Sequence, residues 1–148
     1  MHLAIDGYGG SSNKLDNKDS IYEFLDSYPA KIGMTKITSP RVYRHEARDP
    51  LDSGVSGFVL IAESHISIHT FPKREYVNID VFSCKDFDLK KAVRELKKMF
   101  NLDKVRVWAL ERGLEYSDIA TAKKEINFER SRVIGNPRTG GSETLLDS

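Results

Sequence analysis

The segment from Glu63 to Thr70 concentrates most of the residues in this sequence that could do chemistry. It places an acid, three hydroxyl side chains and two histidines directly after the apolar run Gly57 to Ala62. Burying such polar groups without partners costs about 1–3 kcal/mol each, so the composition is unusual for a strand. A purely structural explanation stays open, because serine and threonine suit strands and the histidines could simply face solvent.

Two familiar kinds of catalytic site fit these residues poorly. A hydrolase that pairs a serine with a histidine would need a sharp turn around its nucleophile, and Ser64 lacks the Gly-x-Ser-x-Gly pattern of such a turn. A metal site built from His65, His69 and Cys84 is conceivable. In an extended strand, however, the two histidines are about 13 Å apart, which is too far to bind one ion. We therefore expect no metal.

Composition and charge narrow the class of protein. The chain has 148 residues and a net charge of +1, with no long run of one sign, so we expect neither nucleic acid nor an anionic membrane as a partner. Its longest apolar stretch is far shorter than the roughly 20 residues that span a bilayer. Asp6 stands where a signal peptide would still be apolar, which favours the cytoplasm. A single cysteine, Cys84, excludes an internal disulfide.

Hydrophobic periodicity predicts strands and two helices. One helix carries apolar residues from Ile21 to Tyr28 and ends at Pro29, and the other begins after Asp86 or Asp88. The run Gly57 to Ala62 is apolar on both faces, which is typical of a fully buried strand. Alternating or apolar segments predict strands at residues 2–7, 35–38, 41–44, 57–62, 64–71, 76–82 and 104–110.

This order of elements predicts an α+β two-layer sandwich, with a mostly antiparallel sheet and two helices on one face. The other face of the sheet would remain apolar and uncovered, so we expect a homodimer with αββα layers. We expect one domain over residues 1–116. Residues 117–148 would form a C-terminal extension, partly a mobile tail, because the last residues are rich in Gly, Ser and Thr.

The chemically dense segment resembles one known family. The run Glu63-Ser64-His65-Ile66-Ser67-Ile68-His69-Thr70, followed by Asp80-Val81-Phe82-Ser83-Cys84, closely resembles the processing and active-site segment of the small prokaryotic S-adenosylmethionine decarboxylases. These proteins are self-processing proenzymes that depend on a pyruvoyl group. The upstream run Gly54-Val55-Ser56-Gly57 also fits, and the resemblance covers roughly residues 2–111.

The resemblance implies that the chain cuts itself between Glu63 and Ser64, into residues 1–63 and 64–148. The Ser64 hydroxyl would attack the Glu63 carbonyl, and elimination and hydrolysis would leave a pyruvoyl group at position 64 and ammonia. His69 would take the α-proton during this processing, with help from Ser56. An imidazole suits that task because it titrates near neutral pH.

In turnover, the resemblance implies a Schiff base between the substrate amine and the pyruvoyl carbonyl, which acts as the electron sink for decarboxylation. Cys84 would then donate the proton that replaces CO₂. The product, S-adenosylmethioninamine, would serve as the aminopropyl donor for spermidine synthesis.

Two substrate-side positions depart from the family pattern. Family members usually carry an acid directly after the proline of the His-Thr-aromatic-Pro segment, where it can hold the ribose hydroxyls. Here that residue is Lys73, although Glu75 lies two residues further on. Many members also carry an adenine-stacking Phe where this chain has Pro50. Phe71 remains available as an aromatic face for adenine.

Lys85, in place of a glycine after the cysteine, is a third departure. Two other functions therefore stay open beside decarboxylation of S-adenosylmethionine. Fold relatives decarboxylate arginine or ornithine with the same pyruvoyl chemistry, and a non-catalytic homologue could regulate an active partner. The intact Glu63, Ser64, His69 and Cys84 argue against the regulator.

Overall fold

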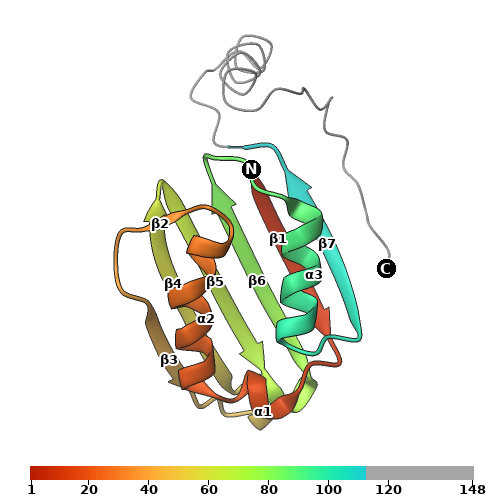
Figure 1. The fold of residues 1–148 in the computed structure, drawn as a ribbon. Coiled ribbons are helices and arrows are strands. Elements are labelled where there is room, and N and C mark those ends of the chain that lie inside the picture. The colour runs from red at the N-terminus through yellow and green to blue at the C-terminus, as the bar shows by residue number, and fades with distance from the viewer. Residues whose placement is uncertain (113–148) are drawn as a thin grey trace, which may run out of the picture.

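The computed structural model describes residues 1–112, which form one antiparallel sheet of seven strands with helices on one side (Figure 1). Helices α2 and α3 lie across one face of the sheet, and the short α1 lies at its lower end. In chain order the elements are β1 (His2–Tyr8), α1 (Ser12–Leu15), α2 (Lys18–Lys31), β2 (Thr35–Lys36), β3 (Arg41–His45), η1 (Pro50–Asp52), β4 (Gly54–Ala62), β5 (Ser64–Phe71), η2 (Pro72–Arg74), β6 (Tyr76–Ser83), α3 (Leu89–Met99) and β7 (Lys104–Leu110).

The strand order is β2-β4-β5-β6-β1-β7, and β3 pairs with β4 alongside β2. All pairings are antiparallel. The predicted α+β architecture, with an antiparallel sheet and its helices on one face, is therefore confirmed. The expected domain boundary at residue 116 and the extension 117–148 lie outside the described residues.

The core lies between the sheet and the helices. Alternate residues of each central strand point inward, as period-two patterning requires, and their partners are apolar stripes on the two longer helices. Buried side chains of this core include Leu3, Ile66, Ile79, Leu25 and Leu96. Each longer helix begins at a side-chain cap, since Asn17 accepts from Ser20 N and Asp88 accepts from Lys91 N.

The helices differ from the sequence-based expectation in two places. Helix α2 does not end at Pro29 but continues to Lys31. Because the proline stands near the end of the helix, it removes one backbone donor without breaking the turns before it, and its buried ring packs on the core. Helix α1 was not expected, because four residues are too short for a periodic signal.

Strand β4 also differs from the expectation that it is buried on both faces. Its inward residues Val59 and Ile61 are fully buried, but Phe58 and Leu60 are 43% and 40% exposed. The reason is that both longer helices cover the same face, and nothing in residues 1–112 covers the other one (Figure 1). We call this second side the open face. No helix within the described residues is long and apolar enough to cross a membrane.

Candidate active site

The predicted cleavage site lies at the tip of a tight hairpin. Strand β4 ends at Ala62 and β5 begins at Ser64, so only Glu63 stands between them, and Ile61 pairs with Ser64 across the turn. Glu63 is exposed, whereas the Ser64 hydroxyl is buried. The scissile bond of the proposed processing therefore lies where a backbone carbonyl and a sheltered hydroxyl are neighbours along the chain.

The Ser64 hydroxyl has no hydrogen-bond partner within residues 1–112. Directly across from it on β6 lies Ser83, which is fully buried. The Ser83 hydroxyl donates to Met34 Sδ at 3.3 Å and accepts from Lys85 N at 3.0 Å. This second bond closes a turn around Cys84, whose side chain is exposed. Ser64 and Cys84 are therefore brought to the same end of the sheet.

The predicted residues Ser56 and His69 contact each other. Ser56 and His69 are cross-strand partners on β4 and β5, and Ser56 Oγ lies 2.9 Å from His69 Nδ1. Both side chains point to the open face. They border a shallow hollow of about 300 Å³ that is lined by Tyr43, Ser56, Gly57, Phe58, His65, Ser67 and His69.

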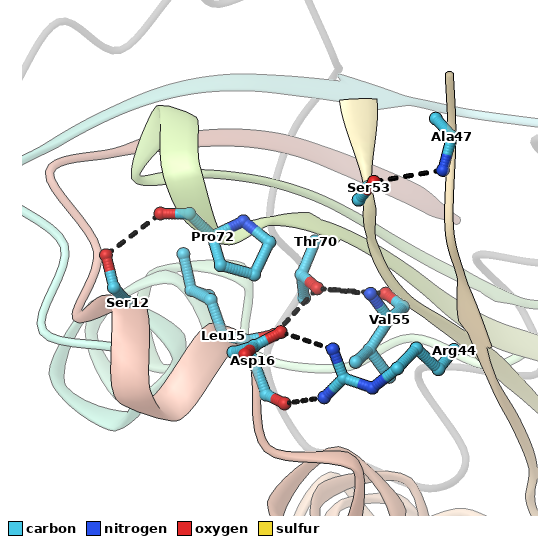
Figure 2. A network of polar contacts seen from close by, with 9 residues as sticks. All are labelled: Ser12, Leu15, Asp16, Arg44, Ala47, Ser53, Val55, Thr70 and Pro72. Carbon is cyan, nitrogen blue, oxygen red and sulfur yellow. Dashed lines mark hydrogen bonds and ion pairs between the residues drawn. The ribbon is translucent and has the colours of Figure 1, made fainter. Parts of the chain in front are cut away.

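The neighbours of this pair along the chain, Val55 and Thr70, belong to a polar network that reaches helix α1 (Figure 2). Thr70 Oγ1 accepts from Val55 N at 2.9 Å, and its proton is directed to Leu15 O at 2.7 Å or Val55 O at 3.0 Å. Nearby, Arg44 donates to both a carboxylate oxygen and the backbone carbonyl of Asp16. Hydrogen bonding to Asp16 and its negative charge raise the pKa of the Arg44 guanidinium.

The two pairs of predicted residues are not brought together in one chain. Ser64 and His69 stand five residues apart on β5, which is about 17 Å along an extended strand. Their side chains also point to opposite faces, since residues an odd number apart alternate. Ser64 faces the helices with Ser83, and His69 faces the open side with Ser56.

The predicted substrate-binding residues lie at the end of β5 that is far from Ser64. Phe71 stacks on Tyr76 with ring centroids 5.5 Å apart, and Tyr8 lies 5.2 Å beyond Tyr76. Burial raises the pKa of Tyr76, and the nearby negative charge of Asp6 raises it further. Glu75 is exposed, in the turn that follows η2. Two residues that depart from the family pattern lie in short turns nearby: Pro50 in η1 and Lys73 in η2.

Two residues of this site were missed by the sequence analysis. Thr70 and Ser83 are the buried polar side chains in the described part of the chain, at 2% and 0% exposure. Each one follows a series of inward apolar residues, Ile66 and Ile68 before Thr70, and Ile79 and Val81 before Ser83. A hydroxyl at the next inward position of such a series is the signal that could have found them.

Within residues 1–112, no group of three His, Cys, Asp or Glu side chains gathers in a way that could hold a metal ion.

Comparison with known proteins agrees with the motif. Residues 1–113 match the sequence profile of S-adenosylmethionine decarboxylase. An S-adenosylmethionine decarboxylase proenzyme of Clostridium botulinum (strain Langeland) is 36% identical over 113 residues, covering 76% of this chain and 92% of the relative. The proenzyme of Thermococcus gammatolerans is 32% identical over 139 residues, covering 92% of each chain, so its match extends into residues 113–148.

A solved structure shares both fold and sequence. The crystal structure of the adenosylmethionine decarboxylase from Aquifex aeolicus VF5 superposes with a TM-score of 0.66 at 30% identity, covering 79% of this chain and 92% of that one. Matches of this length and identity, to a profile, to sequences and to a structure, agree with the motif around Ser64. The chain belongs to the S-adenosylmethionine decarboxylase family.

Proposed function

We propose that this protein is a proenzyme that cuts itself between Glu63 and Ser64 and then decarboxylates S-adenosylmethionine. The name of its relatives states that activity for those proteins. The observation that carries the proposal is the Ser64 hydroxyl, which is buried, has no hydrogen-bond partner within residues 1–112 and directly follows the exposed Glu63 at a hairpin tip. Leaving such a group unpaired is costly, so its retention favours a chemical role.

The self-cleavage can be written with the chain's own atoms. Ser64 Oγ attacks the Glu63 carbonyl carbon, and the amide becomes an ester when the C–N bond breaks. Loss of the Ser64 α-proton then expels the Glu63 carboxylate and leaves a double bond between Cα and Cβ at residue 64. Hydrolysis of that residue releases ammonia and leaves a ketone, the pyruvoyl group.

The surroundings of Ser64 fit this group. A carbonyl at position 64 would supply the electron sink that a decarboxylation requires and that no ordinary side chain provides. Residue 64 is paired with Ser83 and lies beside the turn that presents Cys84. The exposed thiol is the proton donor in our proposal, because Cys84 directly follows Ser83, the residue that pairs with Ser64.

His69 and Ser56 are proposed to handle the α-proton during cleavage. Their hydrogen bond orients the imidazole before any substrate is present. A distance of about 17 Å along β5 prevents His69 from reaching Ser64 of its own chain. The proposal therefore requires His69 from a second copy.

In a homodimer that packs open face against open face, the target of the partner's His69 would be the α-proton on the backbone of residue 64 at the hairpin tip, and not the hydroxyl that faces the helices. Phe58 and Leu60 give that face an exposed apolar area, and packed sheets lie about 10 Å apart, within reach of side chains from both. If His69 of the partner subunit reaches Ser64, then Phe71 of the partner subunit, two residues further along the same face, lies near the same hairpin. It can then stack on adenine, and Glu75 beyond it can accept from the ribose hydroxyls.

Mixed dimers test the shared site. A Ser64→Ala chain and a His69→Ala chain, each with its own affinity tag, are expressed together and purified through both tags. One site of the mixed dimer then holds both changes and the other holds neither. We expect the His69→Ala chain to be cleaved in the mixed dimer and to stay intact alone. A His45→Ala chain serves as the control in place of the His69→Ala chain. It should be cleaved both alone and in the mixed dimer.

If the His69→Ala chain stays intact in purified mixed dimers while wild-type dimers are cleaved, the shared site is wrong. A monomer at micromolar concentration by sedimentation would contradict the dimer itself.

A second substrate class has one observation in its favour. The turns that carry Pro50 and Lys73 are joined, because Arg74 donates to Asp52 at 2.8 Å and to Leu51 O at 3.1 Å. The two substrate-side departures from the family pattern thus lie in one small region, which would suit a changed pocket for arginine or ornithine. Release of labelled CO₂ from each of the three substrates decides the question. Turnover of a basic amino acid without turnover of S-adenosylmethionine would replace the proposed substrate.

A further inference from the structure

We propose that Thr70 is a positioning residue for self-cleavage, which holds the Ser56–His69 pair in the register that proton transfer needs. The inference rests on the proposed function, in which His69 moves a proton. Thr70 itself touches neither the scissile bond nor the imidazole. It is the residue next to His69, and its hydroxyl binds the amide of Val55, the residue next to Ser56.

The end of the strand pairing explains why a side chain is needed here. Backbone pairing between β4 and β5 runs from Ile61 and Ser64 up to Ser56 and His69. At the next position along both strands, the Val55 amide donates to the Thr70 hydroxyl. The functional pair is thus the last rung of this ladder, where strands separate most readily, and the Thr70 hydroxyl holds the two strands together beyond it.

A close backbone approach at the same place supports this role. A Cβ atom at Gly54 would lie 1.8 Å from the Thr70 carbonyl oxygen, so the glycine lets β4 come against β5 immediately beyond the pair. Thr70 is 2% exposed and Val55 is fully buried, and neither group has water as an alternative partner at the surface.

The hydroxyl is also anchored from the helix side. It reaches the carbonyl of Leu15, the last residue of α1, at 2.7 Å, and the following residue, Asp16, is held by Arg44 of β3 (Figure 2). Three segments that are distant in sequence therefore meet at one oxygen atom. A change in that oxygen should alter the position of His69 rather than the core, because the inward apolar residues on either side are unchanged.

The test compares Thr70→Val, which keeps the shape and removes the hydroxyl, with Thr70→Ser, which keeps the hydroxyl. Ser12→Ala is the matched control, because it removes another side-chain bond between α1 and the end of β5, from Ser12 Oγ to Pro72 O at 2.9 Å. The first readout is the rate of cleavage of freshly purified, uncleaved chain. The second is the NMR signal of the His69 ring in uncleaved Ser64→Ala protein that carries each change.

We expect Thr70→Val to slow cleavage by about tenfold or more, because two buried groups lose their partner. It should also shift the His69 ring signal, while Thr70→Ser and Ser12→Ala stay within about twofold of the wild-type rate. Normal cleavage and an unchanged His69 signal in Thr70→Val would overturn the inference. If Thr70→Val does not fold, Thr70→Ser decides alone, since slow cleavage by a folded chain that keeps the hydroxyl contradicts the proposed role.

Failure of the proposed function gives a different result. If His69→Ala cleaves at the wild-type rate, His69 is not the processing base. The shift of the His69 signal in Thr70→Val would then still report whether Thr70 holds the pair.

Discussion

The two ends of strand β5 carry the two halves of the proposed active site, and they are built differently. At the η2 end, Ser56 and His69 already form a hydrogen bond, supported from behind by the Thr70 network. At the hairpin end, the Ser64 hydroxyl has no partner in the described part of the chain, and Cys84 is exposed. Within residues 1–112, the first end therefore has its hydrogen bond already formed, whereas the Ser64 hydroxyl at the other end has none.

In the proposed mechanism, this difference matches what each end would have to do. A proton-transfer pair works best when it is oriented in advance, and cross-strand register achieves that at little cost. A hydroxyl that must attack the preceding carbonyl has to turn toward it, and a hydrogen bond to an unrelated acceptor would compete with that orientation. In the proposed mechanism, Ser64 therefore stays unpaired until the proton-transfer pair of a second copy arrives.

The largest effect is expected at the unpaired end. Ser64→Ala removes the nucleophile, so the chain should remain full length and inactive, with no pyruvoyl terminus at position 64 by intact mass. Ser53→Ala, which removes a loop hydroxyl that accepts from Ala47 N, should cleave normally. A cleaved Ser64→Ala chain would sink the mechanism.

Cys84→Ala, at the same end of β5, distinguishes self-cleavage from decarboxylation. Cleavage should continue at least in part, since the thiol is not needed for attack by Ser64. Decarboxylation should nevertheless fall by about a hundredfold or more in the cleaved fraction, because general acids typically contribute that much. Normal turnover by fully cleaved Cys84→Ala protein would show that another group donates the proton.

The next prediction tests whether cleavage requires a dimer that forms through the open face. Phe58→Asp puts a charge on that face and should shift the protein to monomer by sedimentation, with cleavage slowed in proportion. Tyr22→Asp is the matched control, because Tyr22 is equally exposed, 43%, but lies on helix α2. If both variants behave alike, or if monomeric Phe58→Asp cleaves normally, the two ends do not need a second copy.

A smaller effect is expected at the substrate-binding side. Glu75→Gln should raise KM for S-adenosylmethionine by about ten- to a hundredfold, with less change in kcat, since a charge-assisted bond to a remote ribose is lost. Asp52→Asn is a useful comparison in the neighbouring turn, because its carboxylate is already paired with Arg74. Equal KM values for wild type and Glu75→Gln would remove Glu75 from the pocket.

The sequence predicted the fold well where alternation was strong. The last strand, Lys104–Leu110, and the apolar stripe of α3 agree with the structure because buried faces impose a period. It failed at α1, whose N-cap Ser11 makes no side-chain bond and leaves no signal. For β4, apolar residues on both faces predicted burial, but half of them lie on the open face, which nothing in residues 1–112 covers.

The site was predicted less completely than the fold. The motif identified Ser64, His69 and Cys84 by resemblance, and their roles remain predictions. Their separation was already implied by the sequence, because residues 64 and 69 of one strand face opposite sides. Alternation could have placed Thr70 and Ser83 on the inward face but could not have identified their hydrogen-bond partners, because these lie in segments far away in the chain.

The smallest effect is expected in the helix layer, which packs on the sheet away from both ends of β5. A change there should affect the stability of the protein without favouring either end. Tyr28 of α2 is fully buried against α3, and burial together with the nearby Glu95 raises its pKa above the usual value near 10. As the pH rises, Tyr28 therefore loses its proton in the unfolded chain before it does so in the folded chain. The contribution of Tyr28 to the free energy of unfolding should be constant below pH 10. Above pH 10 it should fall, by up to about 1.4 kcal/mol per pH unit. Tyr28→Phe should lose this part of the pH dependence and cost only about 1 kcal/mol at pH 7, where the long bond to Ala92 O is lost. Denaturant titrations of uncleaved Ser64→Ala protein at pH 7 to 11, with Tyr22→Phe as the exposed control, measure both quantities, and a parallel decline in all three proteins would exclude Tyr28 as its source.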